Sequence, residues 1–109
     1  MQDKLLGAVG LARRAGCTVL SYDLIYKNII KKKMKLVILA ADSSQNTKKK
    51  YRDKCKTYGV PILEYATKEL LGSAVGKEFA AAVGVTDDNF VKLISTYVSE
   101  SRGGPNDES

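Results

Sequence analysis

Hydrophobic and polar residues follow one another along the chain in blocks that predict a succession of helices and strands. In residues 3–15, apolar residues recur at Leu5, Val9 and Ala12, the spacing of one helix face, and Gly16 follows as a stop. Residues 35–41, KLVILAA, are instead a continuous apolar run, which is typical of a strand buried on both faces and predicts parallel neighbours. The same reasoning predicts helices over residues 3–15, 22–33, 47–59, 67–76 and 87–99 and strands over residues 17–20, 35–41, 60–65 and 79–86.

The order of these elements predicts the fold class. Alternating helices and strands usually form one sheet with helices on both faces, so we expect an α/β protein: a three-layer α-β-α sandwich with a small mixed, mostly parallel sheet. The 109 residues, 44% of them hydrophobic, suit one globular domain over residues 1–100. Residues 101–109, SRGGPNDES, have nothing to bury and are expected to be a disordered tail.

Side chains at helix ends and on helix faces refine this prediction. Ser21 and Thr67 each precede a predicted helix and can cap it. Tyr51, Cys55 and Tyr58 recur at helical spacing and predict the buried stripe of the helix over residues 47–59. The remaining faces of that helix are nearly all basic.

Positive charge is concentrated in the first half of the chain. Residues 27–56 contain eleven Lys or Arg and two Asp residues, a net charge of +9, whereas the whole chain carries +6. A lysine run is usually a solvated face, and Lys31, Lys32 and Lys33 also suit the negative end of a helix dipole. Positive charge concentrated on one side of a protein is nevertheless typical of a phosphate-binding surface. A polyanion is therefore the partner to test.

The sequence offers little material for catalysis or metal binding. It has no histidine, and Cys17 and Cys55 lack CxxC spacing, so we expect no metal and two small buried thiols. Residues 72–78, GSAVGKE, differ from a phosphate-binding loop because only three residues separate the glycines and Glu78 follows the lysine. We therefore expect neither an enzyme nor a cofactor. The apolar runs are too short to span a bilayer, which predicts a cytoplasmic protein without a membrane partner.

Four segments, taken in order, resemble one family. They are LGAVGLARRAGCTVLS, KLVILAADSSQNTKKKYRDKC, YGVPILEYATKELLGSAVGK and AAVGVTD. Over about residues 4–98 the chain resembles the ribosomal protein L-seven-Ae/L-thirty-e superfamily, and in particular its small, stand-alone bacterial members. The resemblance implies an α-β-α sandwich without catalysis that binds RNA kink-turns. These are sharply bent internal loops whose sheared G·A pairs dock against the start of the second helix and a nearby hydrophobic loop.

The resemblance also implies which residues contact RNA. The family's Gly-x-Asn-Glu-x-x-Lys signature falls on SYDLIYK, with Ser21 at the glycine, Asp23 at the asparagine, Leu24 at the glutamate and Lys27 at the lysine. The Asn and Glu of the signature read guanine edges. Asp23 can accept from guanine N–H groups but cannot donate, and Leu24 can do neither.

Other candidates come from nearby positions. Tyr22 begins the second helix without an evident core role, Asp42 resembles an acidic position of the family, and Val75 or Phe79 could pack on a splayed nucleotide. The full set of expected RNA-binding residues is Ser21, Tyr22, Asp23, Leu24, Lys27, Lys31, Lys32, Lys33, Lys35, Asp42, Lys48, Val75, Lys77 and Phe79.

The expected partner is a structured RNA: a kink-turn, ribosomal RNA or an mRNA leader, on or off the ribosome. Two alternatives stay open. The chain could be a protein-interaction or homodimerising module with weak nonspecific RNA affinity, because Tyr22 and Leu24 are apolar where RNA readers are polar. It could also position a substrate for a separate RNA-modifying enzyme. The oligomeric state is open, with a monomer as the expectation.

Overall fold

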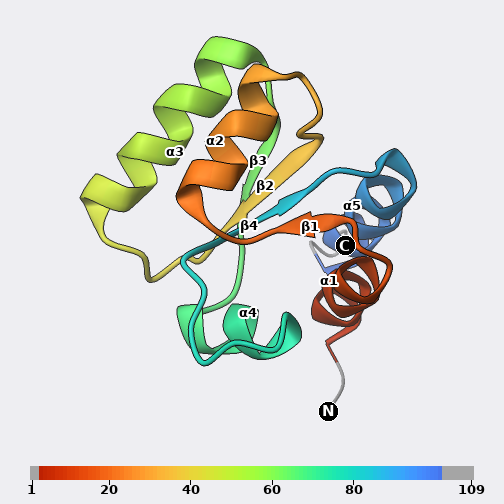
Figure 1. Cartoon of the computed structure of the whole chain (residues 1–109). Coiled ribbons are helices and arrows are strands. Elements are labelled where there is room, and N and C mark those ends of the chain that lie inside the picture. The colour runs from red at the N-terminus through yellow and green to blue at the C-terminus, as the bar shows by residue number, and fades with distance from the viewer. Residues whose placement is uncertain (1–2, 102–109) are drawn as a thin grey trace.

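The computed structural model describes residues 3–101, and every predicted helix and strand is present in the predicted order (Figure 1). The elements are α1 Lys4–Arg14, β1 Thr18–Val19, α2 Tyr22–Ile30, β2 Leu36–Leu39, α3 Gln45–Tyr58, β3 Ile62–Glu64, α4 Lys68–Ala74, β4 Ala82–Val85 and α5 Asp88–Ser101. The predicted tail lies outside the described residues from residue 102 onward, and Ser101 is the last residue of α5.

The four strands form one mixed sheet in the order β1-β4-β2-β3. The expectation of mostly parallel pairing was wrong, because β4 runs antiparallel to both β1 and β2 and only β2 and β3 are parallel. The segment containing α4 connects the end of β3 to the start of β4, which pairs with the end of β2, so the chain re-enters the sheet at the same end and runs back. A continuous apolar run indicates that a strand is buried on both faces. It does not indicate the direction of the neighbouring strands, because burial is the same for either direction.

Helices cover both faces of the sheet, which confirms the three-layer sandwich (Figure 1). Successive residues of β2 point to opposite faces. Val37 and Leu39 pack with Ile25 of α2 and Tyr51 of α3, whereas Ile38 belongs to the cluster formed with α1, α4 and α5. The buried β2 strand therefore holds the two halves of the core together.

Both predicted caps are confirmed. The Leu24 N–H donates to Ser21 Oγ at 3.2 Å, and the Leu70 N–H donates to Thr67 Oγ1 at 3.1 Å. A third cap, Ser44, was not predicted and accepts from the Thr47 N–H at 3.2 Å, which is why α3 starts two residues before the predicted helix. Caps of this kind each stabilise a protein by about 1 kcal/mol.

The predicted stripe of α3 is correct for two of its three residues. Tyr51 and Cys55 are buried, and this burial raises the pKa of Tyr51 to about 12 and that of Cys55 to about 11, so both side chains stay neutral near pH 7. Tyr58 is exposed, because α3 ends there, past the turn that contacts the core. Cys17 is only partly buried, in contrast to the expected buried thiol.

Within residues 3–101, no helix combines the length and the apolar character needed to cross a membrane.

Candidate nucleic-acid interface

Three segments that are distant in the sequence meet at one end of the sheet. Because β4 is antiparallel to β1 and β2, both neighbours run toward the end of the sheet at which β4 begins: Leu39, the last residue of β2, pairs with Ala82, the first of β4, and Val19, the last of β1, pairs with Gly84. The first turn of α2, which follows β1, the loop after β2, and the loop before β4 therefore emerge together (Figure 1). We call this region, formed by Ser21, Asp23, Leu24, Asp42 and Phe79, the α2 N-terminal surface.

The first turn of α2 presents its signature residues to solvent. Ser21 caps the helix, Asp23 is exposed, and the Leu24 side chain is 51% exposed. Lys27 is exposed one turn further along, at i, i+4 from Asp23. The free N–H groups and positive dipole end of a helix start favour acceptor groups here, which accounts for Asp23 in structural terms alone.

Asp42 fixes the loop after β2. Its Oδ1 accepts from the Lys68 N–H at 2.8 Å, so the carboxylate ties this loop to the first turn of α4. The neighbouring Ser43 is buried and donates from Oγ to the Ala81 carbonyl at 3.2 Å. Ser43, which the sequence did not single out, thus connects the loop after β2 to the segment that leads into β4. Asp42 is thus a structural link between the loop after β2 and the start of α4.

The two residues near the loop between α4 and β4 that were expected to pack on a nucleotide, Val75 and Phe79, differ in exposure. Phe79 is 63% exposed, whereas Val75 has no exposed surface and packs in the core with Leu71. A nucleotide cannot reach Val75 without opening the core, so Val75 was a wrong choice. Apolar character alone does not distinguish the two. Lys77, between them, is exposed.

Two arginines that the sequence did not indicate border this loop. Arg13 and Arg14, at the end of α1, line a groove of about 340 Å³ together with Gly76. A Cβ added at Gly76, whose φ is +73°, would lie 3.0 Å from the Arg13 guanidinium. Since α1 and Gly76 are far apart in the chain, only the packing of α1 against α4 could reveal this contact.

Tyr22 has a packing role that the sequence did not show. Its ring contacts Tyr51 edge-on at 5.2 Å and stacks with Tyr26 at 6.0 Å, and Lys50 Nζ lies 4.1 Å from its centre. These contacts join α2 to α3 and cover part of the ring. Tyr22 is therefore a packing residue at the edge of the core, and the expectation that it lacks a core role was wrong.

The predicted lysines do not share one surface. Lys31, Lys32, Lys33 and Lys35 follow the other end of α2, and a nine-residue helix is about 14 Å long. Lys48 is not a free cation, because its Nζ is 3.4 Å from Glu64 Oε1 and its side chain is only 12% exposed. Arg52 pairs with the same glutamate.

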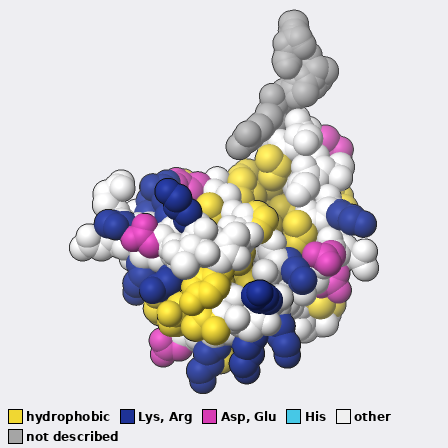
Figure 2. All heavy atoms as spheres, turned by 90° about the horizontal axis from the view of Figure 1, so that it is seen from above, with side chains coloured by type: hydrophobic (Ala, Val, Ile, Leu, Met, Phe, Trp, Pro, Cys, Tyr) yellow, Lys and Arg dark blue, Asp and Glu magenta, His cyan; other side chains and the backbone are white. Residues whose placement is uncertain are grey.

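Basic side chains are nevertheless unevenly distributed over the face shown in Figure 2. Seen from above, most of the visible Lys and Arg side chains lie toward the left and lower part of Figure 2, the half that contains α2 and α3, next to an area of hydrophobic side chains. On this face, the charge is thus distributed asymmetrically, as it is along the sequence.

Two similar proteins are each named RNA-binding protein YlxQ. The one from Bacillus subtilis (strain 168) is 46% identical over 88 residues, which cover 80% of this chain and 88% of the relative. The one from Enterococcus faecium is 35% identical over 91 residues, covering 84% and 87% of the two chains.

Solved structures share the fold. A protein of unknown function from Bacillus halodurans C superposes with a TM-score of 0.85 at 32% identity, covering 90% of this chain and 99% of the other. A 15.5kD RNA binding protein from Giardia lamblia superposes with a TM-score of 0.72 over 89% and 83% of the two chains, and at 20% identity it shows the common fold alone. Residues 3–94, nearly all of the described chain, match one family. The chain therefore belongs to the Ribosomal protein L7Ae/L30e/S12e/Gadd45 family.

Proposed function

We propose that this protein binds structured RNA without catalysing a reaction, and that a kink-turn docks on the α2 N-terminal surface. The observation that carries the proposal is that the capped, exposed first turn of α2 and the loop that carries the exposed Phe79 both emerge at the same end of the sheet. The relatives named as RNA-binding proteins support the general activity. We expect a bacterial cytoplasmic protein that acts as a monomer on ribosomal RNA or an mRNA leader.

Two residues of the surface, Asp23 and Phe79, and four basic residues outside it have specific expected roles. Asp23 accepts hydrogen bonds from a guanine edge, and a good bidentate contact of this type discriminates between bases by about 1–3 kcal/mol. Lys27, together with Lys77, Arg13 and Arg14, contacts phosphates, which positions the RNA but does not read its sequence. Phe79 stacks on a nucleotide that has left the helix.

The first test compares a kink-turn RNA with a duplex of equal length, in magnesium and at two salt concentrations. We expect clearly tighter binding to the kink-turn, and we expect Asp23→Ala and Lys27→Ala each to weaken it. Lys27→Ala should also lower the salt slope by about one unit, because one phosphate contact is lost. Equal affinity for kink-turn and duplex would refute shape recognition, and wild-type affinity of both variants would refute the assigned surface.

Phe79→Ala should weaken kink-turn binding while leaving stability unchanged. Stacking of a base on an aromatic ring contributes about 1 kcal/mol at the lower end of its range, a factor of roughly five in affinity. The ring is 63% exposed, so its removal leaves no cavity. Tyr58→Ala is the matched control, because Tyr58 is an exposed aromatic residue at the far end of α3. If both variants bind like the wild type, Phe79 does not stack on RNA.

One observation favours a second function. Leu24 and Phe79 are both exposed apolar residues of the same surface, with exposed fractions of 51% and 63%. Exposed apolar side chains can form a contact with another protein or a second copy of the chain. Sedimentation over a range of protein concentrations, combined with the RNA titration, decides between the two. Self-association without RNA binding would support the interaction module.

A further inference from the structure

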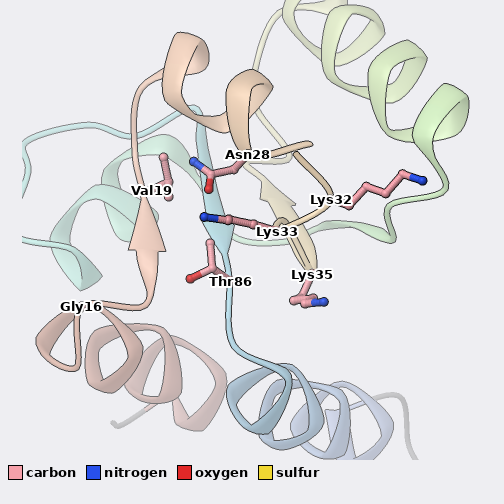
Figure 3. Close-up of a pocket in the computed structure, with 7 residues that line it drawn as sticks. All are labelled: Gly16, Val19, Asn28, Lys32, Lys33, Lys35 and Thr86. Atoms are coloured by element: carbon pink, nitrogen blue, oxygen red, sulfur yellow. The ribbon is translucent and has the colours of Figure 1, made fainter. Parts of the chain in front are cut away.

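A polar pocket lies at the end of α2 opposite to the α2 N-terminal surface (Figure 3). Its volume is about 450 Å³. The lining residues are Gly16, Val19, Asn28, Lys32, Lys33, Lys35 and Thr86. Three lysines, an amide and a hydroxyl thus surround one opening, and no Asp or Glu is among the lining residues.

The backbone of the turn between α2 and β2 holds these lysines in place. The Asn28 carbonyl accepts from the N–H groups of Lys33 and the next residue, at 2.9 and 3.1 Å. The Lys35 N–H donates to the Val85 carbonyl at 2.9 Å. Lys32 has a φ of +61°, a conformation that is uncommon for a residue with a side chain. Several hydrogen bonds on both sides of Lys32 therefore fix a tight turn.

The two uncharged polar side chains of the pocket are oriented by hydrogen bonds of their own. Asn28 Nδ2 donates to the Leu24 carbonyl at 2.8 Å, and Thr86 Oγ1 donates to the Cys17 carbonyl at 3.3 Å. Asn28 Nδ2 keeps a second N–H that can donate to a phosphate oxygen, whereas the Thr86 hydroxyl has already donated its hydrogen. In Figure 3 the Lys33 side chain extends between Asn28 and Thr86, while the Lys32 side chain points away from them.

The lysines around the pocket are unpaired. In residues 3–101 the ion pairs involve Lys48, Lys49 and Arg52, and none involves Lys31, Lys32, Lys33 or Lys35. Asp87, which follows Thr86 in the sequence, has Oδ2 3.8 Å from Cys17 Sγ and accepts from the Asn89 N–H with Oδ1. The helix dipole of α2 explains a cation at Lys31, but it does not reach Lys35 at the start of β2, because its effect fades within the last turn.

We infer that this pocket binds backbone phosphates of the RNA as a second contact, at the far end of α2 from the kink. The inference rests on the proposed function and adds to it a path for the RNA along α2. Lysines bind phosphate as point charges, and the lining residues include no aromatic ring that would stack on a base. The contact is therefore independent of base sequence and acts by positioning an arm of the RNA.

The test uses two RNAs with the same kink-turn, one with a short arm and one with a long arm. The variant Lys33→Gln/Lys35→Gln removes two pocket cations, and Lys4→Gln/Lys92→Gln removes the same charge from two exposed lysines of α1 and α5 that do not line the pocket. For the long-arm RNA we expect the pocket variant to lower the salt slope by about two units, one for each phosphate contact. Its binding to the short-arm RNA should equal that of the control variant.

The possible results separate this inference from the proposed function. Equal salt slopes of the pocket and control variants on the long-arm RNA would overturn the second contact, and a wild-type preference for the kink-turn over duplex would still support the proposed function. No such preference would refute the proposed function and this inference with it. The wild type could also bind inorganic pyrophosphate saturably and bind the long-arm and short-arm RNAs with the same affinity and salt slope. This result would assign the pocket to a free phosphate compound and overturn the RNA contact.

Discussion

Gly72→Ala is expected to destabilise the protein by about 2 kcal/mol, which lowers the melting temperature by roughly 8–16 °C in a domain of this size. Gly72 lies in α4, and a Cβ at this position would be 2.7–2.8 Å from the backbone N, Cα and C atoms of Phe79. Backbone atoms cannot move aside as a side chain can, so the loop must shift. The helix propensity of alanine, about 1 kcal/mol better than that of glycine, offsets part of this cost.

The same substitution should weaken kink-turn binding at temperatures where the variant is still folded. A shift of the loop moves Phe79 away from the first turn of α2, so the two parts of the α2 N-terminal surface lose their alignment. Gly7→Ala is the matched control, because Gly7 is an exposed glycine of α1 with no atom within 4 Å of an added Cβ. It should raise stability by about 0.5–1 kcal/mol and leave RNA binding unchanged. An unchanged melting temperature and affinity of Gly72→Ala would show that the loop yields without cost.

Leu24→Glu is expected to tighten kink-turn binding by about 2 kcal/mol, a factor of roughly 30. The substitution restores the glutamate that the family signature has at this position and provides a carboxylate that can accept two guanine N–H groups. Leu24 is 51% exposed at the start of α2, so the new side chain has room to reach a ligand. A gain in affinity would be diagnostic, because an added negative charge by itself repels RNA.

Two control variants separate base reading from other effects of this change. Leu24→Gln also places an acceptor three residues after the Ser21 cap, which completes the same helix-capping arrangement, but it accepts with a single oxygen. Leu11→Glu adds the same charge at an exposed leucine of α1. We expect the first to bind less tightly than Leu24→Glu and the second to bind more weakly than the wild type. Weaker binding of Leu24→Glu itself would contradict the alignment of SYDLIYK with the guanine-reading signature.

Local sequence features determined the elements and their ends. The periodicity of residues 3–15 and the apolar run in β2 predicted a helix and a strand that the structure contains, because the period of the burial pattern depends on the local conformation of the chain. The caps at Ser21 and Thr67 were predictable for the same reason, since a cap is a contact between residues three apart.

Tertiary structure decided everything that depends on which distant segments lie side by side. It made β4 antiparallel to β2, buried Val75 while leaving Phe79 exposed, paired Lys48 with Glu64, and placed Arg13 beside Gly76. It also divided the basic stretch of the sequence, because Lys31, Lys32, Lys33 and Lys35 follow the C-terminal end of α2 whereas Lys48 and Arg52 of α3 pair with Glu64. By itself, the sequence determined the elements, the layers and the sign of the surface charge, because these follow from local spacing and composition. The direction of the strands, the availability of each side chain and the existence of the pocket were decided by long-range packing, to which residues far apart in the sequence contribute together.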